Sequence, residues 1–307
     1  MHVFLTGATG FVGSYVLRSL IAHGHTARCL VRDADPHLVE GGDPVETVRG
    51  DVTDPATLNG VMEGCDAAIH LVGIIDERPA QSVTFEAVHV EGTIHVVHEA
   101  KQAGIERFIH MSANGAHPNG ASAYQTTKWR AEQHVKESGF DHWTIFRPSI
   151  IFGDPGPNGV EFASRLVQTL VDPFPILPVF GDGRYQLAPI AVEAVADAFV
   201  QALTTDAASG QTYCASGWQA FPFNTVLDRI AKGMNTAPKP KLHIPLWLGR
   251  PLVKLFGRLG LAPISIDQLE MLVSGNTCDP SAFFDDFDVD DTPFTPKHLA
   301  YLRTFRR

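Results

Sequence analysis

The first thirteen residues, MHVFLTGATGFVG, constrain the fold of this chain more than any other stretch. An apolar run at residues 3–5 predicts a buried strand, and three glycines spaced three apart follow it directly. Residues 11–22 then carry apolar side chains at helical spacing, and residues 26–31 predict a second strand. This order of strand, glycine turn, helix and strand predicts a βαβ unit with parallel strands.

Strand and helix patterns continue to alternate as far as Pro148. Such alternation is typical of a parallel sheet with helices on both faces. We therefore predict an α/β protein with a doubly wound parallel sheet of Rossmann type. Further strands are expected at 45–48, 67–71, 107–111 and 142–146, with helices starting at Asp54-Pro55 and covering 85–103 and 122–138.

The composition of the sequence changes after Arg147-Pro148, where proline and glycine become frequent, as in FGDPGPNG at 152–159. Segments of this kind are typical of loops around short elements. The sequence therefore predicts a Rossmann domain over 1–150 and a smaller C-terminal α/β lobe over 151–307, interleaved with the sheet edge. We expect the lobe to hold the substrate or a partner.

Composition excludes several classes of protein. The 307 residues carry a net charge of -10 and no basic stripe, which argues against nucleic-acid binding. The four cysteines are scattered, so the sequence predicts free thiols and neither a disulfide framework nor a metal site. Neither a signal peptide nor an apolar run of about 18 to 20 residues is found, so a cytoplasmic protein is expected.

The three glycines predict a dinucleotide site. Glycine lets the backbone turn tightly and approach a pyrophosphate, and the helix that follows offers free N–H groups and the positive end of its dipole. Strand, glycines and helix stand in the order that this fingerprint requires. The residues expected to bind the cofactor there are Gly7, Thr9, Gly10, Phe11, Val12 and Gly13.

The end of the second strand bears on the choice between NAD(H) and NADP(H). An acidic residue there binds the ribose 2′-hydroxyl of NAD, whereas a guanidinium suits a 2′-phosphate. This chain has Val31 followed by Arg32, which favours NADP(H). Asp33 is the rival, because a strand that ended later would leave Asp33 in the NAD-selecting position. NAD(H) therefore stays an alternative.

Two further strand ends are expected to line the cofactor. Asp51 and Val52 follow the third strand, where a carboxylate can accept a hydrogen bond from the adenine amino group. Leu71, Val72 and Gly73 follow the fourth strand, where the backbone can pass near the ribose. All five are predicted to contact the cofactor.

Ser112 follows the fifth strand, and Tyr124 and Lys128 open the next helix. A tyrosine and a lysine four residues apart lie on one helix face. A phenol with the ordinary pKa of about 10 is a poor acid–base group, and a neighbouring ammonium together with the positively charged nicotinamide would lower that pKa. The three residues are predicted to be catalytic, with Ser112 holding the substrate oxygen.

These motifs resemble the short-chain dehydrogenase/reductase superfamily. The resemblance covers roughly residues 1–200 and rests on TGATGFVGSYV, GDVTD, the serine, the Tyr-xxx-Lys pair and RPSIIFG. In that superfamily the tyrosine is the acid–base, the lysine lowers its pKa and anchors the ribose, and the serine orients the substrate. The resemblance implies these roles for Tyr124, Lys128 and Ser112.

Within the superfamily, the chain looks most like the branch around the nucleotide-binding accessory subunit of mitochondrial complex I and its bacterial relatives. VRD after the second strand, FGDGRYQLAPIAVEAVADA and GNTCDPSAFFDDF carry this resemblance. It implies NADPH binding and a link to quinone metabolism or to a respiratory complex as protein partner. His89 stands where the superfamily often has an asparagine that supports a proton relay. Three interpretations of His89 stay open: it replaces the asparagine in the relay, it is a neutral packed residue, or it marks weakened turnover.

Three functions follow. The leading one is an NADPH-dependent oxidoreductase that acts on a carbonyl or alcohol of a small molecule, including a quinone-related or other lipophilic one. The second is a non-catalytic, nucleotide-bound structural or assembly subunit linked to respiratory complex I. The third is an NAD-dependent sugar-nucleotide epimerase or dehydratase, against which Val31-Arg32 speaks.

Residues 242–261, LHIPLWLGRPLVKLFGRLGL, predict a basic amphipathic helix. Apolar side chains recur near helical spacing, and Arg250, Lys254 and Arg258 recur every four residues on the other side. A helix that packs its apolar face on the protein's own core is the simpler interpretation. The alternative is a helix lying on an anionic membrane surface, which would suit a lipophilic substrate.

Overall fold

The computed structural model describes residues 1–33, 44–156, 159–258 and 264–305. The chain forms two compact units. The first consists of Met1–Pro148, Glu193–Cys214 and Ser281–Val289, and the second of Ser149–Val192, Ala215–Pro280 and Asp290–Arg307. Each unit is therefore assembled from stretches that lie far apart in the sequence.

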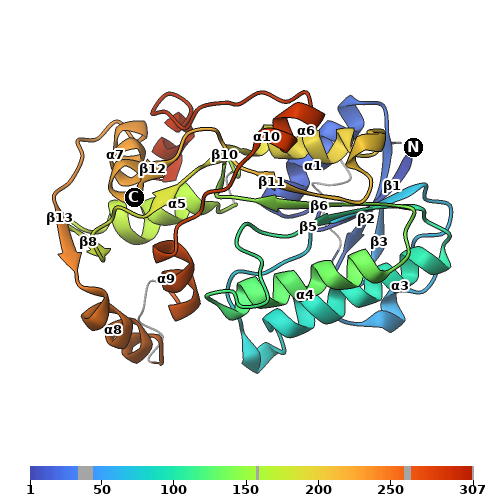
Figure 1. The fold of residues 1–307 in the computed structure, drawn as a ribbon, viewed down its shortest axis with the longest axis horizontal. Helices are drawn as coiled ribbons and strands as arrows, with labels where there is room; N and C mark the ends of the chain where they lie inside the picture. The colour runs from blue at the N-terminus through green and yellow to red at the C-terminus, as the bar shows by residue number, and fades with distance from the viewer. Residues whose placement is uncertain (34–43, 157–158, 259–263, 306–307) are drawn as a thin grey trace. The chain divides into compact units, whose positions relative to one another are not determined.

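The first unit is built on a seven-stranded sheet of order β11-β6-β5-β4-β1-β2-β3 (Figure 1). Neighbouring strands from β3 to β6 run parallel. The strand order runs outward from β1 in both directions, which confirms the predicted doubly wound Rossmann-type α/β fold. The strands are β1 (His2–Thr6), β2 (Thr26–Val31), β3 (Val45–Arg49), β4 (Ala67–His70), β5 (Arg107–Met111), β6 (His142–Pro148) and β11 (Gln211–Ala215).

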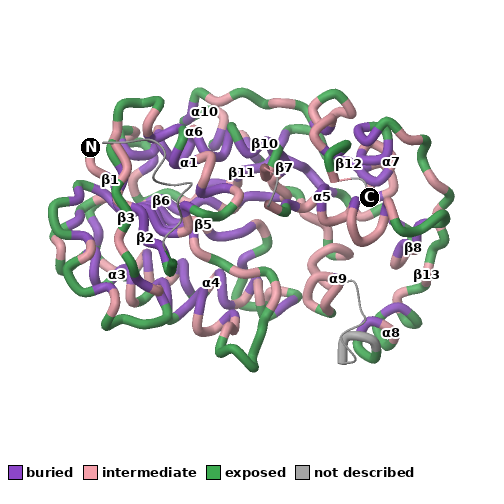
Figure 2. The backbone as a smooth tube through the Cα atoms, turned by 180° about the vertical axis from the view of Figure 1, so that it is seen from behind, coloured by how far each residue is buried: buried purple, intermediate pink, exposed green. Residues whose placement is uncertain are grey.

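Helices cover both faces of this sheet, with α3 and α4 on one side and α1, α6 and α10 on the other (Figure 1). Their bounds are α1 (Phe11–Ala22), α3 (Gly92–Gln102), α4 (Ala123–Glu137), α6 (Val192–Gln201) and α10 (Ser281–Asp286). The central strands β1, β4 and β5 are buried along most of their length, whereas the edge strand β3 has no buried residue (Figure 2). Phe108 of β5 stacks on Phe140 on one face, and Phe146 of β6 packs against Phe199 of α6 on the other.

Two predicted helices differ from those observed. The one starting at Asp54 is only a 3-10 turn, Pro55–Leu58, because Gly60 follows in a left-handed conformation with φ of 73°. The long helix over 85–103 begins with a π-helical turn, Glu86–Glu91, and continues as α3. Short 3-10 turns also occur at Pro79–Gln81 and Asp206–Ala208.

Gly13 sets how closely α1 approaches the turn after β1. A Cβ placed on Gly13 would lie 2.0 Å from the carbonyl oxygen of Gly7. No side chain fits at that distance, so α1 could not start against this turn with any other residue. The third glycine of the sequence motif is therefore a packing requirement of the fold.

The second unit is a small α/β lobe made of paired short strands and short helices. Strand pairs β7–β10 and β8–β13 are parallel, and β9–β12 is antiparallel. The strands are β7 (Ile151–Phe152), β8 (Leu177–Phe180), β9 (Gln186–Leu187), β10 (Ile190–Ala191), β12 (Phe221–Pro222) and β13 (Lys241–Ile244). The helices are α5 (Phe162–Leu166), α7 (Phe223–Gly233), α8 (Leu246–Arg258) and α9 (Ile266–Val273), with a π turn at Val167–Val171 and a 3-10 turn at Ala300–Phe305.

The predicted amphipathic helix over 242–261 is shorter than expected. Residues 242–244 belong to strand β13, and α8 covers Leu246–Arg258. Leu259 and the two residues after it lie outside the described residues, as do the side chains of 256–258. The helix packs through the face that carries Gly249 and Val253, since a Cβ on Gly249 would lie 2.5 Å from the Phe180 ring.

Three apolar side chains of α8 are exposed to solvent. Trp247 is 76% exposed, Leu255 is 57% exposed, and Leu248 is also exposed. On the polar side, the Arg250 guanidinium donates two hydrogen bonds to the Glu270 carboxylate of α9, at 2.7 and 2.9 Å. The simpler interpretation, in which the apolar face packs on the core, is therefore wrong for Trp247, Leu248 and Leu255.

The cysteines behave in two ways. Cys29 and Cys65 are free and buried, and burial raises the pKa of the Cys29 thiol to about 12. Cys214 and Cys278 are disulfide-bonded, so the expectation of free thiols was wrong for these two. Cysteines far apart in sequence form no spacing pattern that would predict a bond.

Two further expectations concern metals and membranes. Among the described residues, no cluster of three or more histidine, cysteine or acidic side chains could hold a metal ion. Within the same part of the chain, no helix has the length and apolar character needed to cross a bilayer.

Candidate active site

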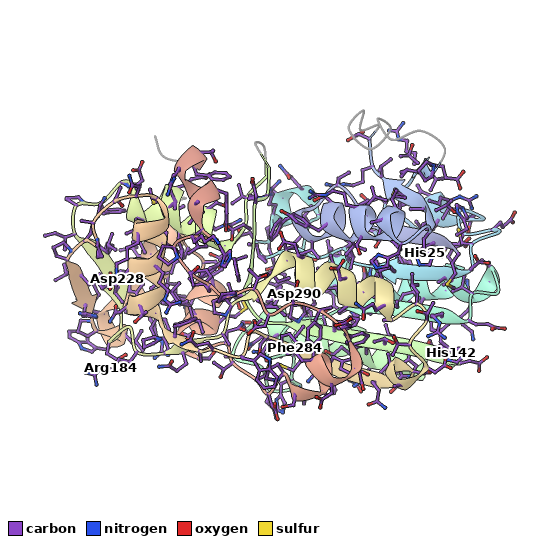
Figure 3. The ribbon with its side chains drawn as sticks, turned by 90° about the horizontal axis from the view of Figure 1, so that it is seen from above. His25, His142, Arg184, Asp228, Phe284 and Asp290 are labelled. Carbon is purple, nitrogen blue, oxygen red and sulfur yellow. The ribbon has the colours of Figure 1, made fainter. Side chains whose placement is uncertain are left out.

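The sequence-predicted site residues follow the carboxyl ends of five neighbouring strands of the first unit. Because these strands are parallel, their carboxyl ends share one edge of the sheet. His25, which precedes β2, and His142, which begins β6, mark the opposite, amino edge (Figure 3). The structure thus brings to one edge predicted residues that range in sequence from Gly7 to Lys128.

The glycine turn packs on the segment that follows β4. Gly7 is left-handed, with φ of 79°, and a Cβ there would lie 3.3 Å from the main chain of Leu71 and Val72. Gly10 begins α1, and no side chain caps the first turn of this helix. By contrast, α4 is capped by the Ser122 hydroxyl, which accepts from the Gln125 N–H at 3.2 Å. The first N–H groups of α1 are thus available to an anion.

The residues predicted around this turn differ in exposure. Thr9 and Gly10 are exposed and Phe11 is half-buried, whereas Val12 is buried. The Val12 side chain belongs to the core, so only its main chain is left to contact a ligand.

The end of β3 offers one carboxylate and one packed side chain. One oxygen of Asp51 accepts from the N–H and the hydroxyl of Thr53, at 2.9 and 2.8 Å, which fixes this carboxylate beside the strand end. Val52 packs into the core against α3, and its carbonyl oxygen lies 2.9 Å from Nδ1 of His95. Of the two predicted residues, Asp51 keeps a polar group near the edge.

Strand β2 ends at Val31, so Arg32 is the first residue after the strand and Asp33 the second. Both side chains are exposed. Asp33 would take the NAD-selecting position only if β2 were longer, and β2 ends at Val31.

Ser112 is tied to a buried ion pair that the sequence prediction missed. The Ser112 hydroxyl donates to the Glu132 carboxylate at 2.5 Å, and Glu132 is fully buried. Arg147, near the end of β6, donates two hydrogen bonds to the same carboxylate, at 2.7 and 2.5 Å. A signal was present, because Tyr124, Lys128 and Glu132 are spaced by four residues on one helix.

This geometry changes what Ser112 can do. A hydroxyl has one proton, and in Ser112 it points at Glu132, so the oxygen offers only lone pairs to a ligand. The serine can therefore accept a hydrogen bond from a hydroxyl as it stands. To donate one to a carbonyl oxygen it must first leave Glu132.

Lys128 is buried as a cation. Its Nζ donates to the Met111 carbonyl oxygen at 2.8 Å, at the end of β5. Burial lowers the pKa of Lys128 to about 8, and the negative charge of Glu132 opposes that shift. A Cβ placed on Gly73 would lie 3.3 Å from Nζ of Lys128 and 3.6 Å from Nε2 of His89. Lys128 thus reaches the segment predicted to border a ribose.

Burial raises the pKa of the Tyr124 phenol to about 12. Desolvation penalises the phenolate, while the Lys128 ammonium is directed to Met111. The lower pKa expected from the sequence applies to the protein with a positively charged nicotinamide bound, and it stays a prediction. The Tyr124 ring packs edge-on against the rings of His89 and Phe85, at 5.3 and 5.8 Å.

His89 is a neutral, packed residue. Burial and the nearby Lys128 cation lower the pKa of His89 to about 2. Nδ1 lies 3.0 Å from the Thr127 hydroxyl, and Nε2 lies 3.1 Å from both the N and the O of Ile74. The Thr127 hydroxyl donates its one proton to main-chain carbonyl oxygens of its own helix, so Nδ1 of His89 donates to the Thr127 oxygen and Nε2 accepts from the Ile74 N–H.

Comparison with known proteins assigns the family. Residues 7–206, more than half of the chain, match the NAD(P)H-binding family, and the chain belongs to it. The 40 kDa subunit of mitochondrial NADH-ubiquinone oxidoreductase from Neurospora crassa is 26% identical over 307 residues, covering 98% of this chain and 78% of that protein. Ceramide reductase from Caulobacter vibrioides is 33% identical over 191 residues, covering 62% of this chain and 57% of the reductase.

Solved structures support the fold. UDP-glucuronic acid 4-epimerase from Bacillus cereus, in complex with UDP-glucuronic acid and NAD, has a TM-score of 0.76 and 17% identity, and the match covers 99% of each chain. At this identity the likeness concerns the fold alone. Together these comparisons confirm the resemblance to NAD(P)-binding short-chain dehydrogenases and reductases, with complex I subunits among the relatives.

The pKa of Lys128 gives a testable consequence for stability. The charged form is disfavoured in the folded state, so its cost is fully present below pH 8 and disappears as the pH rises from about 8 toward 10.5. We expect Lys128→Met to raise the free energy of unfolding by about 1–3 kcal/mol near neutral pH. Urea unfolding at about pH 7 and about pH 10 measures this, with the gain shrinking at the higher pH.

Lys101→Met is the matched control. Lys101 also donates to a carbonyl oxygen, that of Gly139 at 2.8 Å, but it is exposed. Its substitution should change stability little at either pH. A Lys128→Met protein that is less stable than the wild type at both pH values would contradict the buried-cation account.

Proposed function

We propose that this protein is an NADP(H)-dependent oxidoreductase that reduces a carbonyl group of a lipophilic small molecule. The observation that carries the proposal is the position of Lys128, whose Nζ lies against Gly73 beside the uncapped glycine turn, one helical turn from Tyr124. In the proposed arrangement the first unit binds the cofactor, and the second takes the substrate or a partner.

The residues at the carboxyl edge fit a nicotinamide dinucleotide. The uncapped first turn of α1 and the glycines at 7 and 10 leave backbone N–H groups for a pyrophosphate. Lys128 would hold the ribose next to the nicotinamide, and Asp51 the adenine amino group. The cofactor, when bound, supplies the hydride that a carbonyl reduction consumes.

The proton is proposed to come from Tyr124. With its pKa raised to about 12, the phenol is protonated at neutral pH and can donate to a carbonyl oxygen that gains negative charge. The Lys128 cation would stabilise the phenolate that remains.

The preference for NADP(H) rests on Arg32. Because β2 ends at Val31, the exposed guanidinium of Arg32 is the first side chain after the strand. A guanidinium binds a phosphate through paired hydrogen bonds, whereas a carboxylate at that place would repel it.

A second candidate function has its own support. The complex I subunit from Neurospora crassa matches 98% of this chain, across both units. A nucleotide-bound subunit of a respiratory complex needs the cofactor only for stability, which ligand binding supplies by mass action. The epimerase alternative has only fold-level support, because the matching epimerase is 17% identical.

The cofactor proposal is tested by denaturing freshly purified protein and identifying the released nucleotide by mass spectrometry. We expect NADP(H), and we expect stripped protein to bind NADPH more tightly than NADH, with Arg32→Ala weakening NADPH binding at least about tenfold. Recovery of NAD(H), with no effect of Arg32→Ala, would overturn the NADP(H) preference.

Tyr124→Phe separates the two candidate functions. It removes the proton donor and keeps the ring that packs on His89 and Phe85, so NADPH binding and folding should stay unchanged. If the protein is a reductase, turnover of long-chain ketones with NADPH should fall about 100-fold or more. Wild-type protein that holds NADP(H) and oxidises no NADPH with such substrates would favour the subunit role.

We propose that the exposed face of α8 lies on an anionic membrane surface, which would present lipophilic substrates to the protein. Trp247, Leu248 and Leu255 form an apolar group on the helix, and the exposed Lys254 adds positive charge. Apolar residues that enter the interface beside lysine or arginine are typical of helices that lie in the membrane plane. We propose that the protein is cytoplasmic and contacts the cytoplasmic face of a membrane through α8.

Co-sedimentation with vesicles tests the membrane contact. We expect the wild type to bind vesicles that contain phosphatidylserine, and Trp247→Ala/Leu255→Ala to lose most of that binding. Trp218→Ala is the matched control, because Trp218 is 55% exposed and lies outside α8. Equal sedimentation of the wild type and the double variant would rule out α8 as the contact.

A further inference from the structure

We infer that Arg49 is a second residue that binds the 2′-phosphate of the cofactor, beside Arg32. The inference rests on the proposed preference for NADP(H) and deepens it, because it adds a residue from a different strand. Arg49 is the last residue of β3, and β3 is the neighbour of β2 at the edge of the sheet (Figure 1).

The parallel register places Arg49 at the end of β2. Val31 and Arg49 are partners in the ladder between the two strands. The N–H of Gly50 donates to the Val31 carbonyl oxygen at 2.9 Å, and Nε of Arg49 donates to the Arg32 carbonyl oxygen at 3.2 Å. The Arg49 guanidinium therefore lies against the main chain that carries the Arg32 side chain.

Within the described residues, no carboxylate forms an ion pair with the guanidinium of Arg32 or of Arg49. Both side chains are exposed. Arg28, on the same strand as Val31, shows the contrast. It pairs with Glu46 and also donates to the carbonyl oxygens of Val61 and Glu63. Among the described residues, Arg28 inside β2 is therefore paired, whereas Arg32 after β2 and Arg49 at the end of β3 have no ion-pair partner.

The carboxylate nearest in sequence to Arg49 is engaged elsewhere. Asp51 accepts two hydrogen bonds from Thr53 within its own turn. With Nε bound to a carbonyl oxygen, Arg49 keeps the four N–H bonds of its two terminal nitrogens, which match the spacing of phosphate oxygens.

The charge of the ligand matches this pair of cations. A phosphate monoester carries about 1.5 to 2 negative charges at neutral pH. One guanidinium leaves part of that charge unbalanced, and two neutralise it. A ribose 2′-hydroxyl carries no charge, so Arg49 should distinguish NADPH from NADH and leave NADH binding unchanged.

The test compares the two cofactors in Arg49→Ala. By fluorescence titration, we expect the dissociation constant for NADPH to rise about tenfold and that for NADH to stay within about twofold. Arg49→Lys should fall between the wild type and Arg49→Ala, because it keeps the charge and loses the fork. Adenosine 2′-monophosphate, measured against adenosine 5′-monophosphate, should reproduce the loss without a nicotinamide.

Two controls guard the interpretation. NADH affinity reports whether the site stays folded when the bond to the Arg32 carbonyl is lost. Arg130→Ala removes an equal charge from an exposed arginine on α4 that pairs with Glu86, and it should leave both affinities unchanged.

The possible results distinguish the role of Arg49 from the preference for NADP(H) on which it rests. If Arg32→Ala weakens NADPH binding and Arg49→Ala does not, the role of Arg49 is wrong and the NADP(H) preference stands. If wild-type protein binds NADH at least as tightly as NADPH, both fail. If each variant weakens NADPH binding and the double variant loses less than the product of the two effects, the arginines share one phosphate.

Discussion

Parallel pairing of the strands is the constraint on which the candidate site depends. Each strand from β3 to β6 ends at the same edge, and every predicted site residue follows one of these ends or begins the next helix. At this edge the main chain packs closely because glycines carry no side chains. Gly7 and Gly13 allow the turn after β1 to pack against α1 and against the segment after β4. Polar side chains are then added from neighbouring loops.

The second theme is the burial of charge. Lys128 and Glu132 are enclosed between α4 and the sheet, where unpaired charges cost several kcal/mol. Glu132 is satisfied by Arg147 and Ser112, and Lys128 by a single carbonyl oxygen. The carboxylate is therefore well paired, and the ammonium is not. An ammonium held in this way is poised to interact with a ribose or with a phenolate.

In the second unit, the sequence pattern of α8 does not show which side chains pack against the protein. The helix α8 follows an amphipathic pattern, yet it packs through Gly249 and Val253 and leaves Trp247 and Leu255 outside. An apolar stripe by itself does not say what covers it, because a core, a partner and a membrane select for the same residues. The ion pair between Arg250 and Glu270 holds the helix on α9 through its polar side.

The sequence alone determined the order of strands and helices in the first unit and the glycine turn, and it indicated Arg32, Ser112, Tyr124 and Lys128 as candidate site residues. These rest on local periods and short spacings, which a single sequence carries directly. Tertiary structure decided the Glu132–Arg147 pair, the neutral state of His89, the disulfide-bonded cysteines and the position of Arg49 beside Arg32. Each depends on burial or on contacts between distant segments, and the sequence pattern specifies neither. The spacing of four residues between Lys128 and Glu132 is a partial signal, but it does not indicate Arg147 as the partner.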